Sequence, residues 1–219
     1  MSAIGIKEIK NCLYKICEVM AEEKEELTEI DSKLGDGDMG ISMERGALAV
    51  LEVLDGYGDN SVSQLFSSCA NSFNRAAPST LGTLLSFSLL SLAKETVNCD
   101  GLDETDIVRF PDIIAKTISI KGKAKIGDKT ILDALVPFAE TISAVYEETG
   151  NFRKAYSRAV DAAEKGMEDT RGMTARIGRA KWLDGRNKEY PDGGAVLCVR
   201  ILRTLEKDFC MKERIHDNT

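Results

Sequence analysis

The stretch Leu27-Thr28-Glu29-Ile30-Asp31-Ser32-Lys33-Leu34-Gly35-Asp36-Gly37-Asp38-Met39-Gly40 places three aspartates within eight residues. Ionised carboxylates held this close repel one another, so they must stay solvated, take up protons or share a cation. The interleaved glycines permit positive φ and close backbone approach, which lets a short loop fold around an ion. Hard oxygen ligands suit Mg²⁺, which keeps part of its coordination shell for water and phosphate. The stretch therefore favours a magnesium and phosphate site.

Asp36-Gly37-Asp38 is also typical of a plain turn, and the local pattern alone does not separate the two interpretations. An EF-hand loop fits poorly, because Gly40 stands where the third oxygen ligand should be. Other parts of the chain are needed to choose between a metal site and a turn.

The chain has 219 residues, 43% of them hydrophobic and 30% charged, which is typical of one globular domain. We expect a single domain over residues 1–219, with a core of about 5–210 and a polar tail at 211–219. The sequence has no apolar run of about 20 residues that could span a membrane. Its first residues lack the basic and apolar regions of a secretory signal, so we expect a cytoplasmic protein.

The formal net charge of −7 argues against nucleic acid as a partner. Basic residues cluster only locally, at residues 121–129 and 171–188, which suits a small anionic ligand better than a polymer. The one histidine, His216, lies in the polar tail, so we do not expect histidine general-base chemistry, a histidine metal site or a phosphohistidine on this chain.

Apolar residues recur at steps of three and four along most of the chain, which predicts helices. Eight are expected, at about residues 6–20, 43–54, 61–73, 81–92, 103–118, 132–145, 151–167 and 195–209. No series of alternating strands is present, so the predicted fold is all-α, an eight-helix antiparallel up-and-down bundle or barrel. Its longer loops, at residues 31–40, 74–80, 121–130 and 169–194, could converge at one end and build a nucleotide site there.

With these loops identified, the chain resembles the ADP-binding L subunit of the phosphotransferase-dependent dihydroxyacetone kinases, which shares its nucleotide-binding domain with the ATP-dependent dihydroxyacetone kinases. The resemblance runs from about residue 5 to residue 210 and keeps the order and spacing of the motifs. They are Leu27-Thr28-Glu29-Ile30-Asp31, Gly35-Asp36-Gly37-Asp38 with Gly40, Gly82-Thr83, Lys121-Gly122-Lys123-Ala124, Gly127-Asp128-Lys129-Thr130 with Asp133, Ala175-Arg176-Ile177-Gly178-Arg179-Ala180, and Leu183, Arg186 and Asp192 with Gly194-Ala195.

The resemblance implies an eight-helix antiparallel barrel with a nucleotide and two Mg²⁺ ions at one end. It implies three metal ligands: Asp31, Asp36 and Asp38. The nucleotide-binding positions that it implies are Met39, Gly40, Ile41 and Ser42 at a helix start, Ala76 and Ala77 in a phosphate loop, Gly122 and Ile131 at the base, and Arg179, Asp192, Gly193 and Gly194 closing the site. The helix start agrees with the anion preference of helix N-termini. Within the basic run at 121–129, only Gly122 and Lys129 are expected near the ligand.

The activity implied by the resemblance is phosphoryl transfer, in which positioning and charge neutralisation carry most of the catalysis. The family holds ADP as a retained coenzyme that a phosphohistidine partner of the phosphotransferase type converts to ATP. The γ-phosphoryl group then passes to dihydroxyacetone on a separate K subunit. No catalytic side chain beyond the metal and phosphate ligands is expected. The sequence is also compatible with a homodimer.

The chain departs from the family pattern at four places. The family usually has His at Met39, a Gly-Gly-Ala-Ser-Gly-Pro loop at residues 74–79, His near Tyr190 and Pro at Gly193. Ser79 or Thr80 is a candidate to replace the lost loop serine. The changes fit a branch that acts on another triose or tetrose, or a weakened enzyme.

Two other functions remain open. One is an Mg-nucleotide domain for a different acceptor, as in the distantly similar fatty-acid kinases. The other is a helical interaction module that has kept the fold and lost the nucleotide. Assaying the purified chain for bound adenine nucleotide and Mg²⁺ separates these from the kinase subunit.

Overall fold

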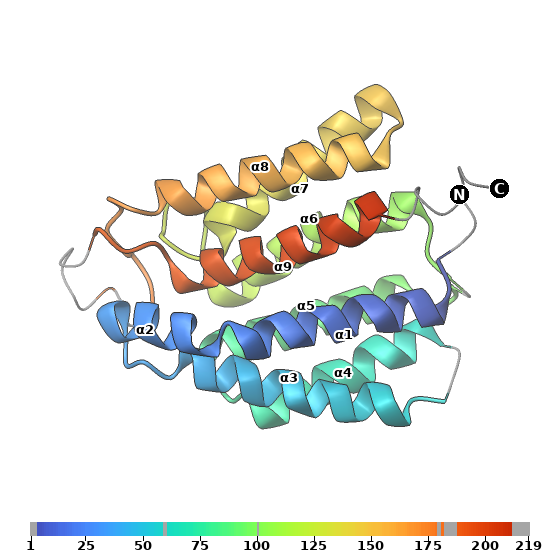
Figure 1. The fold of residues 1–219 in the computed structure, drawn as a ribbon, viewed down its shortest axis with the longest axis horizontal. Helices are drawn as coiled ribbons and strands as arrows, with labels where there is room; N and C mark the ends of the chain where they lie inside the picture. Colours follow the sequence, from blue (N-terminus) through green and yellow to red (C-terminus); the bar gives the residue numbers. More distant parts are fainter. Residues whose placement is uncertain (1–3, 59–60, 100, 179–180, 182–187, 212–219) are drawn as a thin grey trace.

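The computed structural model describes the chain except for residues 1–3, 59–60, 100, 179–180, 182–187 and 212–219, and for the side chains of residues 210 and 211. The described residues form nine helices (Figure 1). They are α1 (Ile6–Glu22), α2 (Lys24–Leu34), α3 (Met39–Gly56), α4 (Val62–Ala76), α5 (Thr80–Glu95), α6 (Glu104–Gly122), α7 (Leu132–Thr149), α8 (Phe152–Asp169) and α9 (Gly193–Met211). This part of the chain has no strand, only one bridge between Ile4 and Leu102. The predicted all-α fold is confirmed.

Within the described residues the helix count is one higher than predicted, because residues 24–34 form a helix of their own. The sequence predicts no helix between residues 20 and 43 and a loop over residues 31–40. The reason for the extra helix is a stripe of three buried side chains, Leu27, Ile30 and Leu34, at helical spacing. Asp31 therefore lies on the last turn of α2 and not in a loop.

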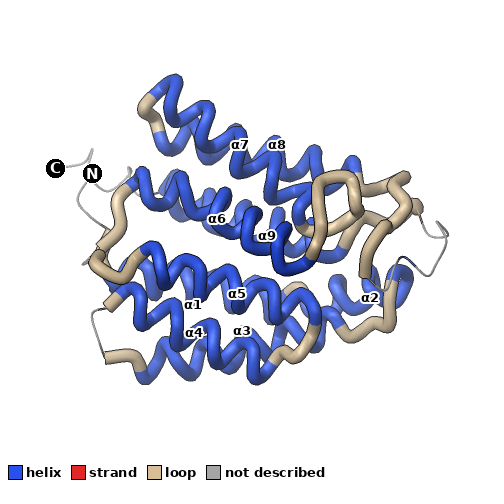
Figure 2. Tube along the Cα trace, turned by 180° about the vertical axis from the view of Figure 1, so that it is seen from behind, coloured by secondary structure: helices blue, strands red, loops and turns tan. Residues whose placement is uncertain are grey.

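The helices lie side by side along the long axis of the molecule. α2 continues in the direction of α1, and the helices from α3 on alternate in direction (Figure 1). The described N- and C-terminal parts approach one end, and α2 lies at the other (Figure 1). Figure 2 shows long loops gathered at the α2 end. The connections after α2, α4, α6 and α8 fall at this end, which is the arrangement that the sequence predicted for the four polar loops.

Two clusters of buried apolar side chains fill the interior. One joins α1 to α5 and contains Met43, Leu54 and Leu65, each 0% exposed. The other joins α6 to α9 around Phe138 and Val160. The first turns of α9 contribute to both clusters, so the start of this helix is held firmly between them.

α8 packs through a face of small residues. Ala155, Ala159 and Ala163 are each 0% exposed and belong to the second cluster. A Cβ on Gly166 would come within 2.1 Å of the carbonyl oxygen of Asp133, so α7 and α8 approach closely at this point. That approach fixes Asp133 at the start of α7, next to the loop that precedes it.

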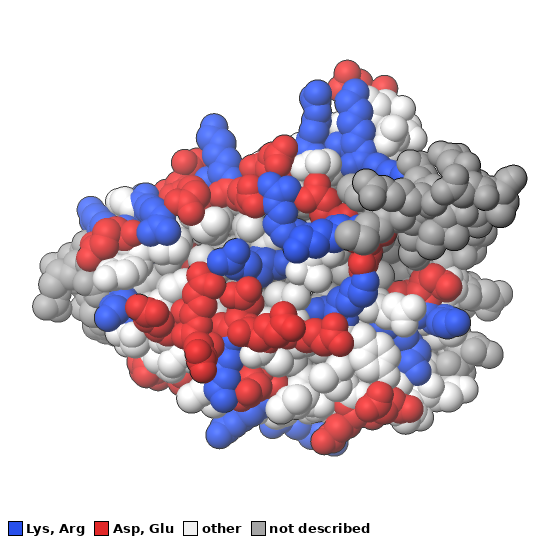
Figure 3. Space-filling view, in the orientation of Figure 1, with Lys and Arg blue, Asp and Glu red and all other residues white. Residues whose placement is uncertain are grey.

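Acidic and basic side chains alternate on the face that carries α1, α8 and α9, with a band of Asp and Glu across it (Figure 3). Arg200 bridges to Glu23 and Glu26, and Arg203 bridges to Glu164 and Asp161. None of the helices in the described ranges is both long and apolar enough to cross a bilayer.

Candidate magnesium and nucleotide site

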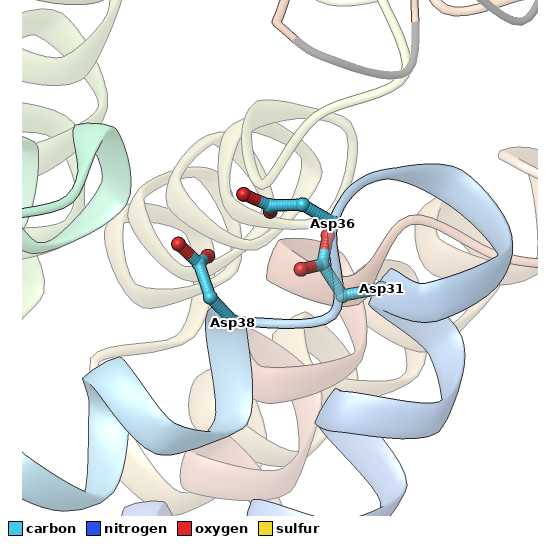
Figure 4. Close-up of side chains that lie close together, drawn as sticks. All are labelled: Asp31, Asp36 and Asp38. Atoms are coloured by element: carbon cyan, nitrogen blue, oxygen red, sulfur yellow. The ribbon is translucent and has the colours of Figure 1, made fainter.

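The three predicted metal ligands come together. Asp31 stands on the last turn of α2, Asp36 in the short connection, and Asp38 directly before the first residue of α3 (Figure 4). One carboxylate oxygen from each lies within 4.8 Å of the other two. Asp36 is exposed, and Asp31 and Asp38 are partly buried. The cluster therefore opens to solvent at Asp36, while Asp31 and Asp38 are partly covered by the surrounding chain.

Two glycines explain why this short connection can bring the acids together. A Cβ on Gly35 would come within 2.5 Å of Oδ1 of Asp31, so a side chain there would displace the carboxylate. A Cβ on Gly40 would come within 2.0 Å of the carbonyl oxygen of Lys24 and 2.4 Å of Oγ1 of Thr28. Only glycine at position 40 lets the start of α3 lie against α2.

Burial raises the pKa of Asp31, and the negative charges of Asp36 and Asp38 raise it further. Hydrogen bonds from the backbone N–H groups of Met39 and Asp38 oppose this, and the Met39 bond measures 3.2 Å. The described site thus concentrates negative charge that a bound cation would offset.

The donor set fits Mg²⁺. Carboxylate oxygens are the hard ligands that this ion prefers. With Mg–O bonds of about 2.1 Å, ligands on one octahedral ion are about 3.0 Å apart when neighbouring and about 4.2 Å apart when opposite, so oxygens within 4.8 Å of one another would draw together to share an ion.

The first turn of α3 presents backbone donors beside the acids. The N–H of Ser42 donates to the carbonyl oxygen of Asp38 over 2.9 Å, and the N–H groups of Gly40 and Ile41 precede this first helical hydrogen bond. The N–H of Met39 already donates to Asp31. Such groups and the helix dipole favour an anion. A cation held by the aspartates and a phosphate held by α3 would lie next to each other.

The α4–α5 connection, which the resemblance marks as a phosphate loop, has several of its groups committed to structural contacts. Ala76 ends α4, and the side chain of Ala77 is 0% exposed in the first apolar cluster. Ser79 caps α5 by accepting a 3.1 Å hydrogen bond from the N–H of Gly82, and Thr80 is the first residue of that helix. The Ser79 hydroxyl therefore already has a structural role, and the exposed Thr80 is the better placed of the two candidates for a phosphate contact.

The connection between α6 and α7 is organised by two buried acids. Asp133 accepts hydrogen bonds from the N–H groups of Gly127 (2.5 Å) and Thr130 (2.7 Å). Asp128 accepts one from the N–H of Lys125 over 2.9 Å. The resemblance marked both acids without a role, and their contacts identify them as residues that shape the loop between Gly122 and Ile131.

Three of the predicted regions meet at the start of α9. A Cβ on Gly193 would come within 2.9 Å of Sδ of Met39, and a Cβ on Gly194 would come within 3.1 Å of Cβ of Ile131. The contacts join the first residue of α3, the α6–α7 loop and the first turn of α9. Two of the family departures, Met39 and Gly193, are thus neighbours in space.

Asp192 precedes α9 and caps it, because its Oδ1 accepts a 2.8 Å hydrogen bond from the N–H of Ala195. Its own N–H donates to Oγ1 of the buried Thr170 over 2.9 Å. Burial raises the pKa of Asp192 to about 7, against the lowering effect of the bonds from Ala195 and Gly194 and of the Lys129 charge. Arg179, the remaining predicted ligand, lies outside the described residues.

Comparison with known proteins identifies the family. The DAK2 domain matches residues 33–207 of the chain. L-erythrulose kinase of Pectobacterium atrosepticum is 33% identical over 81% of the chain, which spans only 30% of that protein. The ADP-binding subunit DhaL of the PEP-dependent dihydroxyacetone kinase of Escherichia coli is 27% identical over 90% of the chain and 94% of its own length.

Solved structures agree on the fold. The dihydroxyacetone kinase of C. freundii superposes with a TM-score of 0.71 at 20% identity, covering 91% of this chain and 34% of the kinase. The same kinase in complex with AMP-PNP and Mg²⁺ gives a TM-score of 0.70 at 18% identity, covering 95% of this chain and 35% of the kinase. The family match covers most of the sequence and the all-helical fold agrees with it, so the chain belongs to the DAK2 domain family.

Proposed function

We propose that the chain is the nucleotide-binding subunit of a dihydroxyacetone-type kinase. It would hold ADP or ATP with Mg²⁺, while a partner subunit holds the short ketose that accepts the γ-phosphoryl group. The observation that carries the proposal is the meeting of Asp31, Asp36 and Asp38 within 4.8 Å at the start of α3. The 27% identity to the Escherichia coli ADP-binding subunit over 90% of this chain supports the nucleotide-binding role.

In this proposal Asp31, Asp36 and Asp38 hold two Mg²⁺ ions, and the N–H groups at the start of α3 bind the terminal phosphates. The bound Mg²⁺ supplies charge neutralisation at the transferring phosphoryl group. The metal and nucleotide of the C. freundii kinase complex are consistent with this assignment. Gly122, Ile131, Arg179 and the residues at the start of α9 enclose the remainder of the nucleotide.

The protein side chains position charge and exclude water, and none is assigned as a general base. The single histidine of the sequence is His216, so a phosphohistidine donor has to come from a partner protein. A K-type subunit and a phosphotransferase-type donor subunit are therefore the proposed partners.

The acceptor is a triose or a tetrose. L-erythrulose kinase, at 33% identity, acts on a four-carbon ketose according to its name, whereas the subunit from Escherichia coli belongs to a dihydroxyacetone kinase. Both acceptors present a hydroxyl group next to a carbonyl group, so one nucleotide subunit could serve either. The partner that binds the ketose would decide between them.

The test is to purify the chain, denature it and assay the supernatant for adenine nucleotide and Mg²⁺, and to measure the melting temperature of nucleotide-free protein with and without Mg·ADP. We expect bound ADP, or a rise in melting temperature on adding Mg·ADP, because a ligand that binds the native state stabilises it. Glu29→Gln, an exposed acid on α2 outside the cluster, is the control and should behave as the unaltered chain. Absence of both nucleotide and thermal shift would exclude the proposal.

A further inference from the structure

Lys129 lies in the connection between α6 and α7, yet its side chain is only 4% exposed. Its backbone is left-handed, with φ of 61°, a conformation that non-glycine residues seldom adopt. Burial lowers the pKa of its ammonium group, an effect that the charges of Asp192 and Glu189 oppose. A lysine rarely takes such a position in a surface loop unless it makes specific contacts.

The contacts reach across the site. Nζ of Lys129 donates to the carbonyl oxygen of Tyr190 over 2.8 Å and to that of Met173 over 3.4 Å. These carbonyl groups stand near the two ends of the connection between α8 and α9. A third link is the N–H of Arg176, which donates to the carbonyl oxygen of Asp128 over 3.1 Å. Lys129 thus ties the α6–α7 loop to the chain on both sides of the α8–α9 connection.

The position of the start of α9 relative to Ile131 depends on this tie. Tyr190 is two residues before Asp192, which caps α9, and Gly194 packs against Ile131. The Lys129 bond to Tyr190 and the Gly194 contact with Ile131 join the same two segments, the end of the α6–α7 connection and the residues around the start of α9. These segments carry Gly122, Ile131 and Asp192 to Gly194, which form the base end of the proposed nucleotide site.

We propose that Lys129 is a positioning residue for the nucleoside part of the nucleotide, acting through the backbone of Tyr190 and Met173 to set the α6–α7 loop against the start of α9. The inference rests on the proposed function. It separates the base end of the site from the phosphate end, because Lys129 donates to carbonyl groups of the α8–α9 connection and not to α2 or α3. The start of α9 meets α3 at Gly193 through the flexible side chain of Met39, which can adjust without moving the aspartates. Loss of the ammonium group should therefore weaken binding of a nucleotide and spare binding of a diphosphate without a base.

The test compares Mg·ADP with Mg·pyrophosphate as ligands, using calorimetric titration of nucleotide-free protein. The variant Lys129→Met keeps the length of the side chain and removes its donors. We expect it to weaken Mg·ADP binding about tenfold or more, since two hydrogen bonds from a charged group are lost, and to change the Kd of Mg·pyrophosphate less than about twofold. Lys129→Arg keeps the charge and the donors and should restore most of the ADP affinity.

Lys125→Met is the matched control, because Lys125 is an exposed lysine of the same loop, and it should leave both affinities unchanged. If Lys129→Met does not fold, Lys129→Gln, which has a shorter neutral side chain, decides the comparison. Equal losses for Mg·ADP and Mg·pyrophosphate, no loss for either, or failure of both variants to fold would overturn the inference. Failure of the unaltered chain to bind Mg·ADP would instead contradict the proposed function.

Discussion

Met39 and Gly193 lie against each other: a Cβ placed on Gly193 would come within 2.9 Å of Sδ of Met39. The contact joins the first residue of α3, next to the aspartate cluster, to the first residue of α9. These are two of the positions at which the sequence departs from the pattern of the dihydroxyacetone kinases that it resembles. Their proximity suggests that the two departures compensate for each other.

The contact predicts coupling between the two positions. Gly193→Ala should destabilise the chain by about 1 kcal/mol, because the methyl group forces the flexible Met39 side chain to move. The same change should cost less in a Met39→Ala background, which has room for the methyl group, giving a coupling of about 0.5 kcal/mol or more. Urea unfolding of the two single variants and the double variant measures it, and strictly additive effects would contradict the coupling.

Asp36→Asn and Asp38→Asn should abolish phosphoryl transfer in a reconstituted assay with the partner subunits. The fold should survive, with the unfolding free energy changed by less than about 0.5 kcal/mol or slightly increased, because each change relieves repulsion among the acids. Glu29→Gln on α2 serves as the control and should retain activity. Full activity in either aspartate variant would show that its carboxylate is not a metal ligand.

Gly40→Ala should destabilise the chain by about 2–4 kcal/mol and weaken Mg²⁺ binding, because the added Cβ would meet the backbone carbonyl of Lys24 and push α3 away from α2. The matched variant is Gly56→Ala at the other end of α3, where a Cβ would meet nothing within 4 Å. Thermal unfolding and Mg²⁺ titration compare the two. Similar behaviour of both variants would contradict the close approach at Gly40.

The raised pKa of Asp192 predicts that the stability of the chain depends on pH. Its pKa rises from 3.8 to about 7 in the folded chain, so between these values the folded state holds the proton more strongly than the unfolded state. The contribution of Asp192 to the unfolding free energy should therefore fall as the pH rises from about 4 to about 7 and stay constant above that range.

Asp192→Asn tests this dependence, because asparagine keeps an oxygen that can cap α9 and cannot ionise. Subtracting its unfolding free energy from that of the unaltered chain at each pH isolates the Asp192 titration. The unfolding free energy of the unaltered chain should fall relative to that of the variant as the pH rises to about 7. A constant difference would mean that the Asp192 pKa is not raised.

The sequence predicted most of the fold because amphipathic periodicity marks a helix wherever one face is buried. The stripe of Ile6, Ile9 and Leu13 was sufficient for α1. The same approach misses α2, whose three buried side chains stand among eight other residues that include acidic ones, and so it places Asp31 in a loop. The expected gathering of four loops at one end followed from helix count and alternation, and α2 did not disturb it because it lies at that end.

The site was predictable where chemistry is concentrated in the sequence and not where it depends on distant contacts. Three aspartates within eight residues are compatible with an ion site or a plain turn, and the resemblance of the other loops to the kinase family favours the ion. The role of Lys129 could not be derived, because its partners are carbonyl groups 44 and 61 residues away and carry no side-chain signature. Likewise, Ser79 was a candidate for phosphate binding, but the structure gives its hydroxyl the capping of α5.

The central claim is that Asp31, Asp36 and Asp38 bind the metal that accompanies the nucleotide. The most direct measurement is a crystal structure with Mn²⁺ and ADP, using the anomalous signal of Mn²⁺ to locate it. The account predicts anomalous peaks at about 2.2 Å from carboxylate oxygens of these aspartates, with the diphosphate against the first turn of α3. A diphosphate bound elsewhere on the chain, or bound Mn²⁺ with no aspartate of this cluster in its coordination shell, would contradict it.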